Sequence, residues 1–236
     1  MNIAKLTKSA FKDILHLFYP HNCIGCGTDV IQPDKVLCFR CYQRLPYTGF
    51  ENIRNNPVER TFIGRANVEQ AAAILYFSKH SIVQNLMFEL KYRGNRNAGL
   101  FLGKLMGQAV AESKRFGSID ILIPMPLNRK RLKQRGYNQA EILIEGIQQK
   151  IPLQASFSAV ARIHYTETQT HKDRTARWQT MQTVFKVNEP EKLDGKNILI
   201  VDDVITTGAT MEALVNAITT EVPCSVSVIS AAWTSK

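Results

Sequence analysis

Short aliphatic runs alternate with segments of helical periodicity over most of the chain that follows residue 66. Residues 198–201 are four consecutive aliphatic side chains, typical of a strand buried on both faces of a parallel sheet. A helical pattern follows at 211–220. Similar patterns predict strands at 71–77, 119–123, 160–164 and 225–232, and helices at 81–92, 98–116, 138–149 and 175–182. This alternation predicts an α/β fold, a parallel sheet flanked by helices, for residues 67–236.

The first 66 residues follow a different pattern. Residues 1–18 carry apolar side chains at helical spacing with lysines off that face, which predicts an amphipathic helix that ends before Pro20. Docking on the protein is the favoured role of this helix, and association with a membrane surface is the alternative. Residues 19–48 form a cysteine-rich module, and residues 49–66 are polar and irregular, which predicts a linker. We expect the module and the main domain to have separate cores.

Composition and charge narrow the class of protein. The 236 residues are 44% hydrophobic and 21% charged, as in a soluble globular protein. There is neither a signal-peptide pattern nor an apolar run near the ~20 residues of a membrane span, so we expect a cytoplasmic protein without stable membrane insertion. The net charge of +10 favours polyanionic ligands such as nucleic acid, polyphosphate or acidic lipid, without choosing among them.

Four cysteines in two Cys-x2-Cys pairs predict a metal site. Cys23 and Cys26 form the first pair, and Cys38 and Cys41 form the second after eleven intervening residues. This spacing is typical of two knuckles that share one tetrahedral Zn2+, and four thiolates leave no open position, so the zinc is expected to be structural. Two disulfides are the main rival, and a redox dithiol is a weaker one. Cys224 is interpreted as a core residue.

A second chemical pattern follows the strand at 198–201. Two carboxylates, Asp202 and Asp203, stand at its end, and a turn with three hydroxyls precedes the next helix. Backbone N–H groups at a helix N-terminus favour an anion, so the turn is interpreted as a phosphate cradle. The two acids suit sugar hydroxyls or a metal rather than the phosphate itself. The turn is formed by Thr206, Thr207, Gly208, Ala209 and Thr210.

Two basic stretches are the third pattern. Five cations fall within residues 129–135, after Pro-x-Pro at 124–126, and a second basic stretch covers residues 171–177. Each stretch alone is most simply a solvated loop. Beside a strongly anionic ligand, however, such a density of positive charge is useful.

The order of strand, paired acids and Thr-Thr-Gly-Ala-Thr turn resembles the signature of type I phosphoribosyltransferases, which bind 5-phosphoribosyl-1-pyrophosphate (PRPP). Together with the Arg135-Gly136-Tyr137-Asn138-Gln139 segment, Gln169-Thr170 and the cysteine knuckles, the chain resembles the ComF family, whose members include ComFC-like and GntX-like proteins. The resemblance runs from about residue 18 to residue 233. It implies a type I phosphoribosyltransferase-like domain preceded by a small zinc-ribbon module.

The resemblance also implies roles for individual residues. Asp202 and Asp203 would hold the ribose hydroxyls, and residues 206–210 would wrap the 5′-phosphate. Mg2+ would accompany PRPP. The pyrophosphate would meet Arg129, Arg131 and Arg135, and the catalytic set would be Asp202, Asp203 and Arg135. Lys91, Arg93 and Arg174 are weaker candidates for the same anion.

Three functions remain open from the sequence. The family resemblance implies a role in natural competence, in which the protein handles single-stranded DNA in the cytoplasm with a competence helicase or other DNA-uptake proteins. Phosphoribosyl transfer to a nucleobase in salvage, and PRPP sensing without catalysis, are the alternatives. Tyr92, Tyr137 and Trp178 stand near cations and suit base stacking, although such aromatics are more often core residues.

Overall fold

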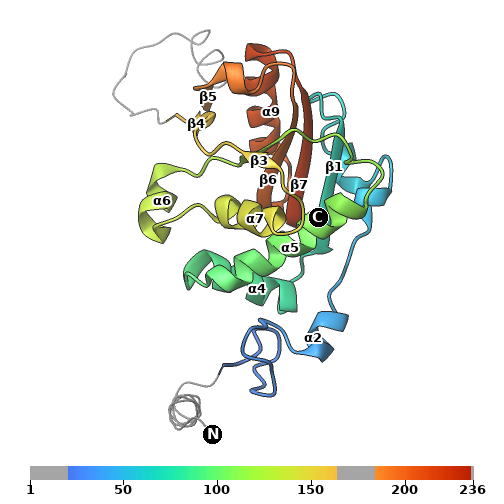
Figure 1. Ribbon diagram of the computed structural model, residues 1–236, viewed down its shortest axis with the longest axis vertical. Coiled ribbons are helices and arrows are strands. Elements are labelled where there is room, and N and C mark those ends of the chain that lie inside the picture. The colour runs from blue at the N-terminus through green and yellow to red at the C-terminus, as the bar shows by residue number, and fades with distance from the viewer. Residues whose placement is uncertain (1–20, 164–183, 235–236) are drawn as a thin grey trace, which may run out of the picture.

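The computed structural model describes residues 21–163 and 184–234 (Figure 1). The predicted helices at 1–18 and 175–182 lie outside the described residues, as do the basic stretch at 171–177, Gln169-Thr170 and Trp178.

A five-stranded parallel sheet forms the centre of the fold, which confirms the predicted fold class. Its strand order is β1-β7-β6-β2-β3, and every neighbouring pair is parallel. The strands are β1 (Gln70–Tyr76), β7 (Ser225–Trp233), β6 (Asn197–Ile205), β2 (Ile121–Pro124) and β3 (Gln154–Ala155). The central strand β6 pairs with β7 from Asn197 to Ile205 and with β2 over residues 198–201, so its aliphatic half has a neighbour on each side.

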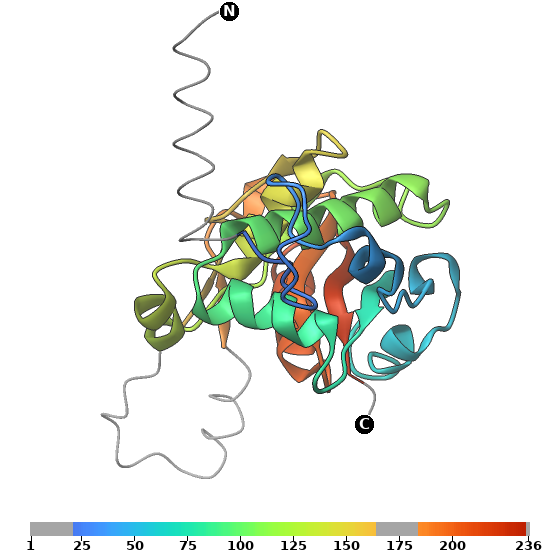
Figure 2. The ribbon, with the colours of Figure 1, turned by 90° about the horizontal axis from the view of Figure 1, so that it is seen from below.

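The connections place helices on both faces of this sheet. The chain crosses from β1 to β2 and from β2 to β3 in one direction, but from β6 to β7 in the other. Because such crossovers are right-handed, the helices of the first two connections cover one face and the helix of the third covers the opposite face. Figure 2 shows the first group from below. The first group contains α4 (Ile82–Tyr92), α5 (Arg96–Glu112) and α7 (Gln139–Gln148), and the helix of the third connection is α9 (Ala209–Glu221).

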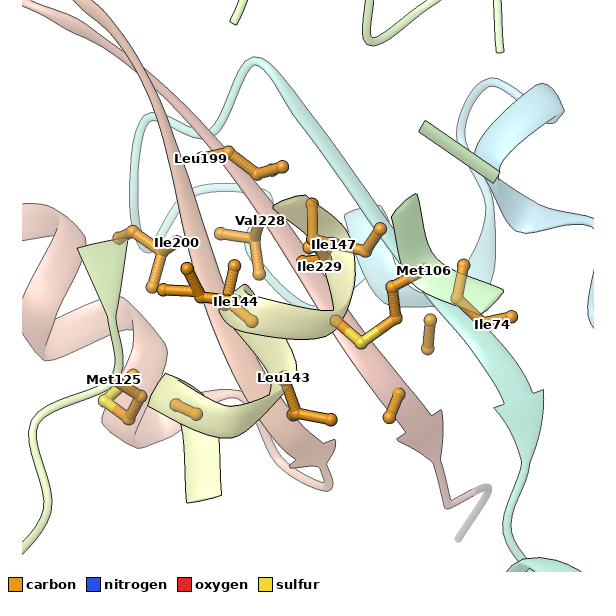
Figure 3. Packing of buried hydrophobic residues seen from close by; sticks show 14 of the residues in the cluster. Ile74, Met106, Met125, Leu143, Ile144, Ile147, Leu199, Ile200, Val228 and Ile229 are labelled. Carbon is orange, nitrogen blue, oxygen red and sulfur yellow. The ribbon is translucent and has the colours of Figure 1, made fainter. Parts of the chain in front are cut away.

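The core is concentrated around the aliphatic half of β6. All four side chains at 198–201 are fully buried, as expected for a strand covered on both faces. Figure 3 shows Ile144 and Ile147 of α7 lying over the sheet, where Ile200 and Val228 belong to β6 and β7. Because α7 packs on the sheet, residues 136–138, which lead into α7, are also held in place.

Helices α5 and α7 approach each other unusually closely. A Cβ atom at Gly103 of α5 would lie 2.2 Å from the carbonyl oxygen of Leu143, and one at Gly146 of α7 would lie 2.6 Å from the carbonyl oxygen of Leu100. Real Cβ atoms do not approach backbone this closely, so both positions require glycine. The two backbones are in direct contact, and α7 is therefore held rigidly against α5.

Two segments differ from the predictions. The strand predicted at 160–164 is β4 (Val160–Arg162), and it pairs antiparallel with β5 (Phe185–Val187) outside the main sheet. The basic stretch expected as a loop is instead the helix α6 (Arg129–Arg135). The Asn128 side chain accepts a hydrogen bond from the Lys130 N–H at its start, and Gly136 ends it with a φ of 78°.

The segment 49–66 is more ordered than the irregular linker that we expected. It contains η1 (Phe50–Asn52) and α3 (Pro57–Arg60), and it buries Phe62 as well as Asn56. The Asn56 amide donates to the carbonyls of Phe50, Ile53 and Ala71, and its oxygen accepts from two N–H groups of α3. A buried amide with all these bonds satisfied holds the segment against β1.

The cysteine-rich module, which includes α2 (Phe39–Gln43), does not have a separate core. Its buried residues Cys23, Leu37, Cys41 and Leu45 belong to the same apolar cluster as the main domain. The Asn85 amide of α4 also donates to the carbonyl of Ile24 at 3.2 Å. The expectation of two independent cores was therefore wrong.

A short helix, η2 (Pro190–Lys192), precedes β6. Among residues 21–163 and 184–234, no helix is both long and apolar enough to cross a membrane.

Candidate functional site

A cavity of about 370 Å³ lies beyond the carboxyl ends of β2 and β6. These two neighbouring strands lead into crossovers of opposite direction, which opens a crevice at their carboxyl ends. The segment after β2 contributes residues 125–127, and the end of β6 with the start of α9 contributes residues 202–211. Both acids and the whole 206–210 turn that the sequence predicted as a site therefore line one cavity.

The turn is shaped by Gly208. Its φ of 73° is in the left-handed region, and a Cβ there would lie 3.0 Å from Thr61 Oγ1 and 3.2 Å from a ring carbon of Phe62. Helix α9 begins directly after Gly208, and no side chain caps it. Its first-turn N–H groups, which have no acceptor within the helix, are thus available to an anion, and the helix dipole favours the same charge.

Arg65, from the segment before β1, supports the turn from outside. Its guanidinium donates to the Thr207 carbonyl oxygen at 3.1 Å and forms an ion pair with Glu212 in the first turn of α9. The segment predicted as a linker thereby packs against the 206–210 turn. No sequence pattern indicated this contact, because 142 residues separate its two partners.

The two acids differ in their surroundings. Lys91 of α4 forms an ion pair with Asp203, with 2.8 Å between Nζ and Oδ1. Asp202 instead accepts a hydrogen bond from the Asp203 N–H at 2.7 Å. Burial, together with the adjacent Asp203 carboxylate, raises the pKa of Asp202 to about 7. The pair can therefore accept hydrogen bonds at Asp203 while Asp202 responds to the charge of a ligand.

Cations from three elements surround the acids. Arg131 and Arg135 of α6 line the cavity, and so do Lys91 of α4 and Arg162 of β4. Burial and the nearby Arg131 lower the pKa of Arg162. Arg129, predicted together with Arg131 and Arg135, is exposed and is not among the lining residues. Four cations against two acids give the cavity a surplus of positive charge, which suits a polyanion.

The Arg-Gly-Tyr-Asn-Gln segment has a clear structural role. Asn138 caps α7 by accepting from the Ala140 N–H, and it donates to the Met125 carbonyl after β2. Arg135 donates to Gln139 at 2.6 Å. Tyr137 is half-buried and donates its hydroxyl to the Leu90 carbonyl, so it positions α4 rather than presenting its ring to a ligand. The segment thus ties the cationic helix to the rigid part of the fold.

The four predicted cysteines come together at a second site. Their sulfur atoms all lie within 4.8 Å of one another, and no disulfide joins them. A zinc–sulfur bond of ~2.3 Å in tetrahedral geometry requires sulfur atoms about 3.8 Å apart. The Sγ atoms of Cys26 and Cys38 are 3.8 Å apart. Burial alone would raise the pKa of the Cys23 thiol, but hydrogen bonds from the backbone, first that of Cys38, lower it to about 7. The cluster fits a structural zinc ion.

Comparisons with known proteins agree with this geometry. A family model described as "Phosphoribosyl transferase domain" matches residues 133–235. "Competence protein ComFC" of Bacillus subtilis is 25% identical over 198 residues, which cover 77% of each chain. "Competence protein F" of Haemophilus influenzae is 28% identical and the match covers 56% of this chain and 58% of that protein. The chain is thus similar to competence proteins of the ComF type and contains a match to the phosphoribosyl transferase domain.

Other relatives match over a shorter span. "DNA utilization protein YhgH" of Escherichia coli is 28% identical over 129 residues, which cover 53% of this chain and 56% of that one. The chain thus spans about half the length of several curated relatives that it matches. Among solved structures, the PRPP amidotransferase of B. subtilis has a TM-score of 0.43 at 17% identity and covers 60% of this chain and 30% of its own. The hypoxanthine phosphoribosyltransferase of Staphylococcus aureus has a TM-score of 0.35 at 12% identity, over 57% and 62% of the two chains. The family assignment does not depend on these two structures.

Two cations that line or support the cavity were missed from the sequence. Arg162 lies on a short strand of the second sheet, about 40 residues before the acids, and no motif surrounds it. Arg65 lies in the segment interpreted as a linker. Lys91 was a weak candidate, and its ion pair with Asp203 now gives it a definite place in the cavity. In each case the missing information was the distance in space, which neither periodicity nor spacing encodes.

The raised pKa of Asp202 has a consequence for stability. An acid with a higher pKa in the folded than in the unfolded protein makes folding less favourable as the pH rises from about 4 to about 7. Asp202→Asn removes this cost and keeps an oxygen that can accept from the Asp203 N–H. We expect the variant to be more stable than the parent by up to about 4 kcal/mol above pH 7, with the difference vanishing near pH 4. Denaturant unfolding of both proteins at pH 4.5 and pH 8 measures it, and an equal difference at the two pH values would contradict it.

The cysteine cluster predicts one zinc ion per chain. Cys26→Ser removes one of four thiolates and should abolish stoichiometric zinc binding, because zinc in structural sites needs all four ligands. Elemental analysis of protein purified without chelators measures the metal content. Cys224→Ser is the matched control, since this cysteine lies outside the cluster and should retain one equivalent. Wild-type protein without zinc would remove the metal from the site.

Proposed function

We propose that this protein binds PRPP with Mg2+ in the cavity at the ends of β2 and β6, and that it acts on single-stranded DNA during natural competence in the cytoplasm. One observation carries the PRPP part of the proposal. The 206–210 turn at the start of α9, two adjacent carboxylates and a group of guanidinium ions line the same cavity. PRPP carries a 5′-phosphate, ribose hydroxyls and a pyrophosphate, and each matches one of these groups.

Each part of the cavity has a proposed role. The N–H groups of the 206–210 turn bind the 5′-phosphate at the start of α9. Asp202 and Asp203 accept hydrogen bonds from the ribose hydroxyls, and Arg131 and Arg135 bind the pyrophosphate. A bound Mg2+ would supply further positive charge between the pyrophosphate and ribose oxygens, and the acidic pair in a cation-rich cavity fits such a ligand.

Lys91 has to change partners when the ribose binds. In the structure its ammonium lies 2.8 Å from the Asp203 carboxylate, at the position where a hydroxyl would donate. A ribose hydroxyl at Asp203 displaces the ammonium toward the solvent side of the cavity, where the pyrophosphate provides a new negative partner. The ion pair of Lys91 is thus exchanged rather than lost.

The competence part of the proposal is supported by the relatives and by charge. Two relatives are named competence proteins and others DNA utilization proteins. The net charge of +10 favours a polyanion larger than PRPP. Partners among the DNA-uptake proteins, including a helicase, belong to the same proposal.

Phosphoribosyl transfer is a second candidate, favoured by the position of Arg131 and Arg135. Cleavage of the bond between ribose C1′ and pyrophosphate leaves a polyanion, and two guanidinium ions beside it would stabilise the departing charge. Incubation with PRPP, Mg2+ and individual nucleobases distinguishes the functions. Release of pyrophosphate that depends on one base identifies a transferase, whereas tight PRPP binding without release identifies a sensor.

Removal of one acid tests the PRPP site. Asp203→Asn should weaken PRPP binding in the presence of Mg2+ by about 1.5–3 kcal/mol, because a charge-assisted hydrogen bond becomes a neutral one. Isothermal titration calorimetry measures the difference. Asp194→Asn is the control, since this exposed acid lies outside the cavity. Equal affinities of Asp203→Asn and the parent would exclude Asp203 from the site.

Salt dependence tests the DNA part. Binding of a single-stranded oligonucleotide should weaken steeply with salt, and combined replacement of Arg129, Lys130 and Arg131 by Gln should reduce the logarithmic slope by about two. Fluorescence anisotropy at several salt concentrations, with and without PRPP, measures the slope. Combined replacement of Lys104, Lys114 and Lys150 by Gln removes three exposed cations outside the cavity and is the charge-matched control, and its slope should change less. Wild-type protein that binds no single strand at low salt would reject the DNA role.

A further inference from the structure

Helix α4 presents different chemistry on its two sides. Lys91 points into the PRPP cavity and reaches Asp203, whereas the next residue, Tyr92, is 63% exposed. Phe88, one turn earlier, is 48% exposed. The two rings lie 5.3 Å apart between centroids with an interplanar angle of 42°. Two large adjacent aromatic rings in contact with water form an apolar surface beside the mouth of a cationic cavity.

Guanidinium groups flank both rings. Arg93 lies over the Phe88 ring at 5.7 Å, and Arg135 of α6 lies over the Tyr92 ring at 5.4 Å. Both distances are within the range of a cation–π contact. Arg135 also lines the PRPP cavity, so the aromatic surface and the cavity share one cation.

Support of the helix alone does not account for this arrangement. Aromatic residues four positions apart stabilise a helix by mutual contact, which would explain Phe88 and Tyr92 as a pair. Mutual contact does not explain why Arg135, from a different helix, lies over the Tyr92 ring. It also does not explain why about half or more of each side chain is exposed to water. Interleaved aromatic rings and cations are, by contrast, the usual composition of surfaces that bind unpaired bases and a phosphate backbone.

We propose that Phe88 and Tyr92, flanked by Arg93 and Arg135, form a stacking platform for consecutive bases of single-stranded DNA. This inference rests on the proposed DNA function and deepens it by assigning the surface that contacts the bases. The rings stack on the bases, and the two guanidinium groups neutralise the phosphates on either side. A free nucleobase carries no phosphate and gains nothing from the second of these contacts, which favours a strand over a single base.

The direction of the strand follows from the neighbouring surfaces. Arg135 connects the platform to the PRPP cavity on one side. Arg93 connects it on the other side to a groove of about 710 Å³, which runs beside the first cysteine knuckle and includes Asn85 and Asn95. A strand on the platform therefore passes from the PRPP cavity toward the zinc module, along the exposed side of α4.

The test compares an aromatic variant with a matched control in the full-length protein. Phe88→Leu with Tyr92→Leu keeps apolar contacts along the helix but removes both rings. It should weaken binding of a single-stranded oligonucleotide at least tenfold, because base stacking on aromatic rings contributes strongly and independently of sequence. The salt slope should stay unchanged because no cation is removed. Phe157→Leu is the control, a ring of similar exposure, 50%, elsewhere on the surface. Thermal unfolding and calorimetry with PRPP verify that the fold and the PRPP cavity are intact.

Photo-crosslinking of an iodouridine-substituted oligonucleotide provides a readout that a structural role would not change. Mass spectrometry should locate the crosslink at Tyr92 or Phe88. If the double variant binds the oligonucleotide as tightly as the wild-type protein, or if crosslinks form only at other sites, the proposed platform is overturned and the DNA function stands. A wild-type protein that binds PRPP but no single strand at low salt would overturn both the DNA function and the platform.

Discussion

The central strand β6 imposes two opposite requirements on the rest of the protein. Its first half consists of aliphatic side chains that must be covered on both faces, and α7 and α9 on opposite faces provide that cover. Its second half carries two adjacent carboxylates whose mutual repulsion must be offset by positive charge. Lys91 of α4 and Arg131 and Arg135 of α6 bring positive charge to the cavity that these acids line. One strand thus carries both the centre of the core and the two acids of the site.

The parts of the molecule that could be predicted are those in which a local pattern has one physical explanation. Four consecutive aliphatics demanded a buried strand, and the turn that follows had to start a helix. Two Cys-x2-Cys pairs required four sulfur atoms at one point, and the structure brings them within 4.8 Å. The acids and the 206–210 turn are neighbours in sequence, so their meeting in one cavity followed directly from the strand that precedes them.

The parts that could not be predicted depend on distances in space. The cations at 129–135 gave no apolar periodicity, because α6 buries none of its residues, and the stretch therefore resembled a loop. Arg162 reaches the cavity from a separate two-stranded sheet, and nothing in its neighbourhood distinguishes it. The glycines of α5 and α7 show their purpose only once the helices are placed in contact, where any Cβ would collide with backbone. The order of the polar segment at 49–66 depends on one buried residue, Asn56, whose side-chain amide forms hydrogen bonds with five backbone groups. The sequence pattern does not reveal these bonds.

The contacts of Arg65 with the 206–210 turn have an energetic consequence for any ligand. Fixing the backbone of one residue costs roughly 1–2 kcal/mol of conformational entropy. In this protein Arg65 holds the Thr207 carbonyl, and Thr61 and Phe62 lie against Gly208, so contacts within the protein itself fix the turn. The loop is thus preorganised, and its ordering is completed during folding rather than at the moment of binding. Most of the interaction energy with a small anion then appears as affinity. In a loop that became ordered only around its ligand, part of that energy would be offset by the entropy cost of ordering the loop.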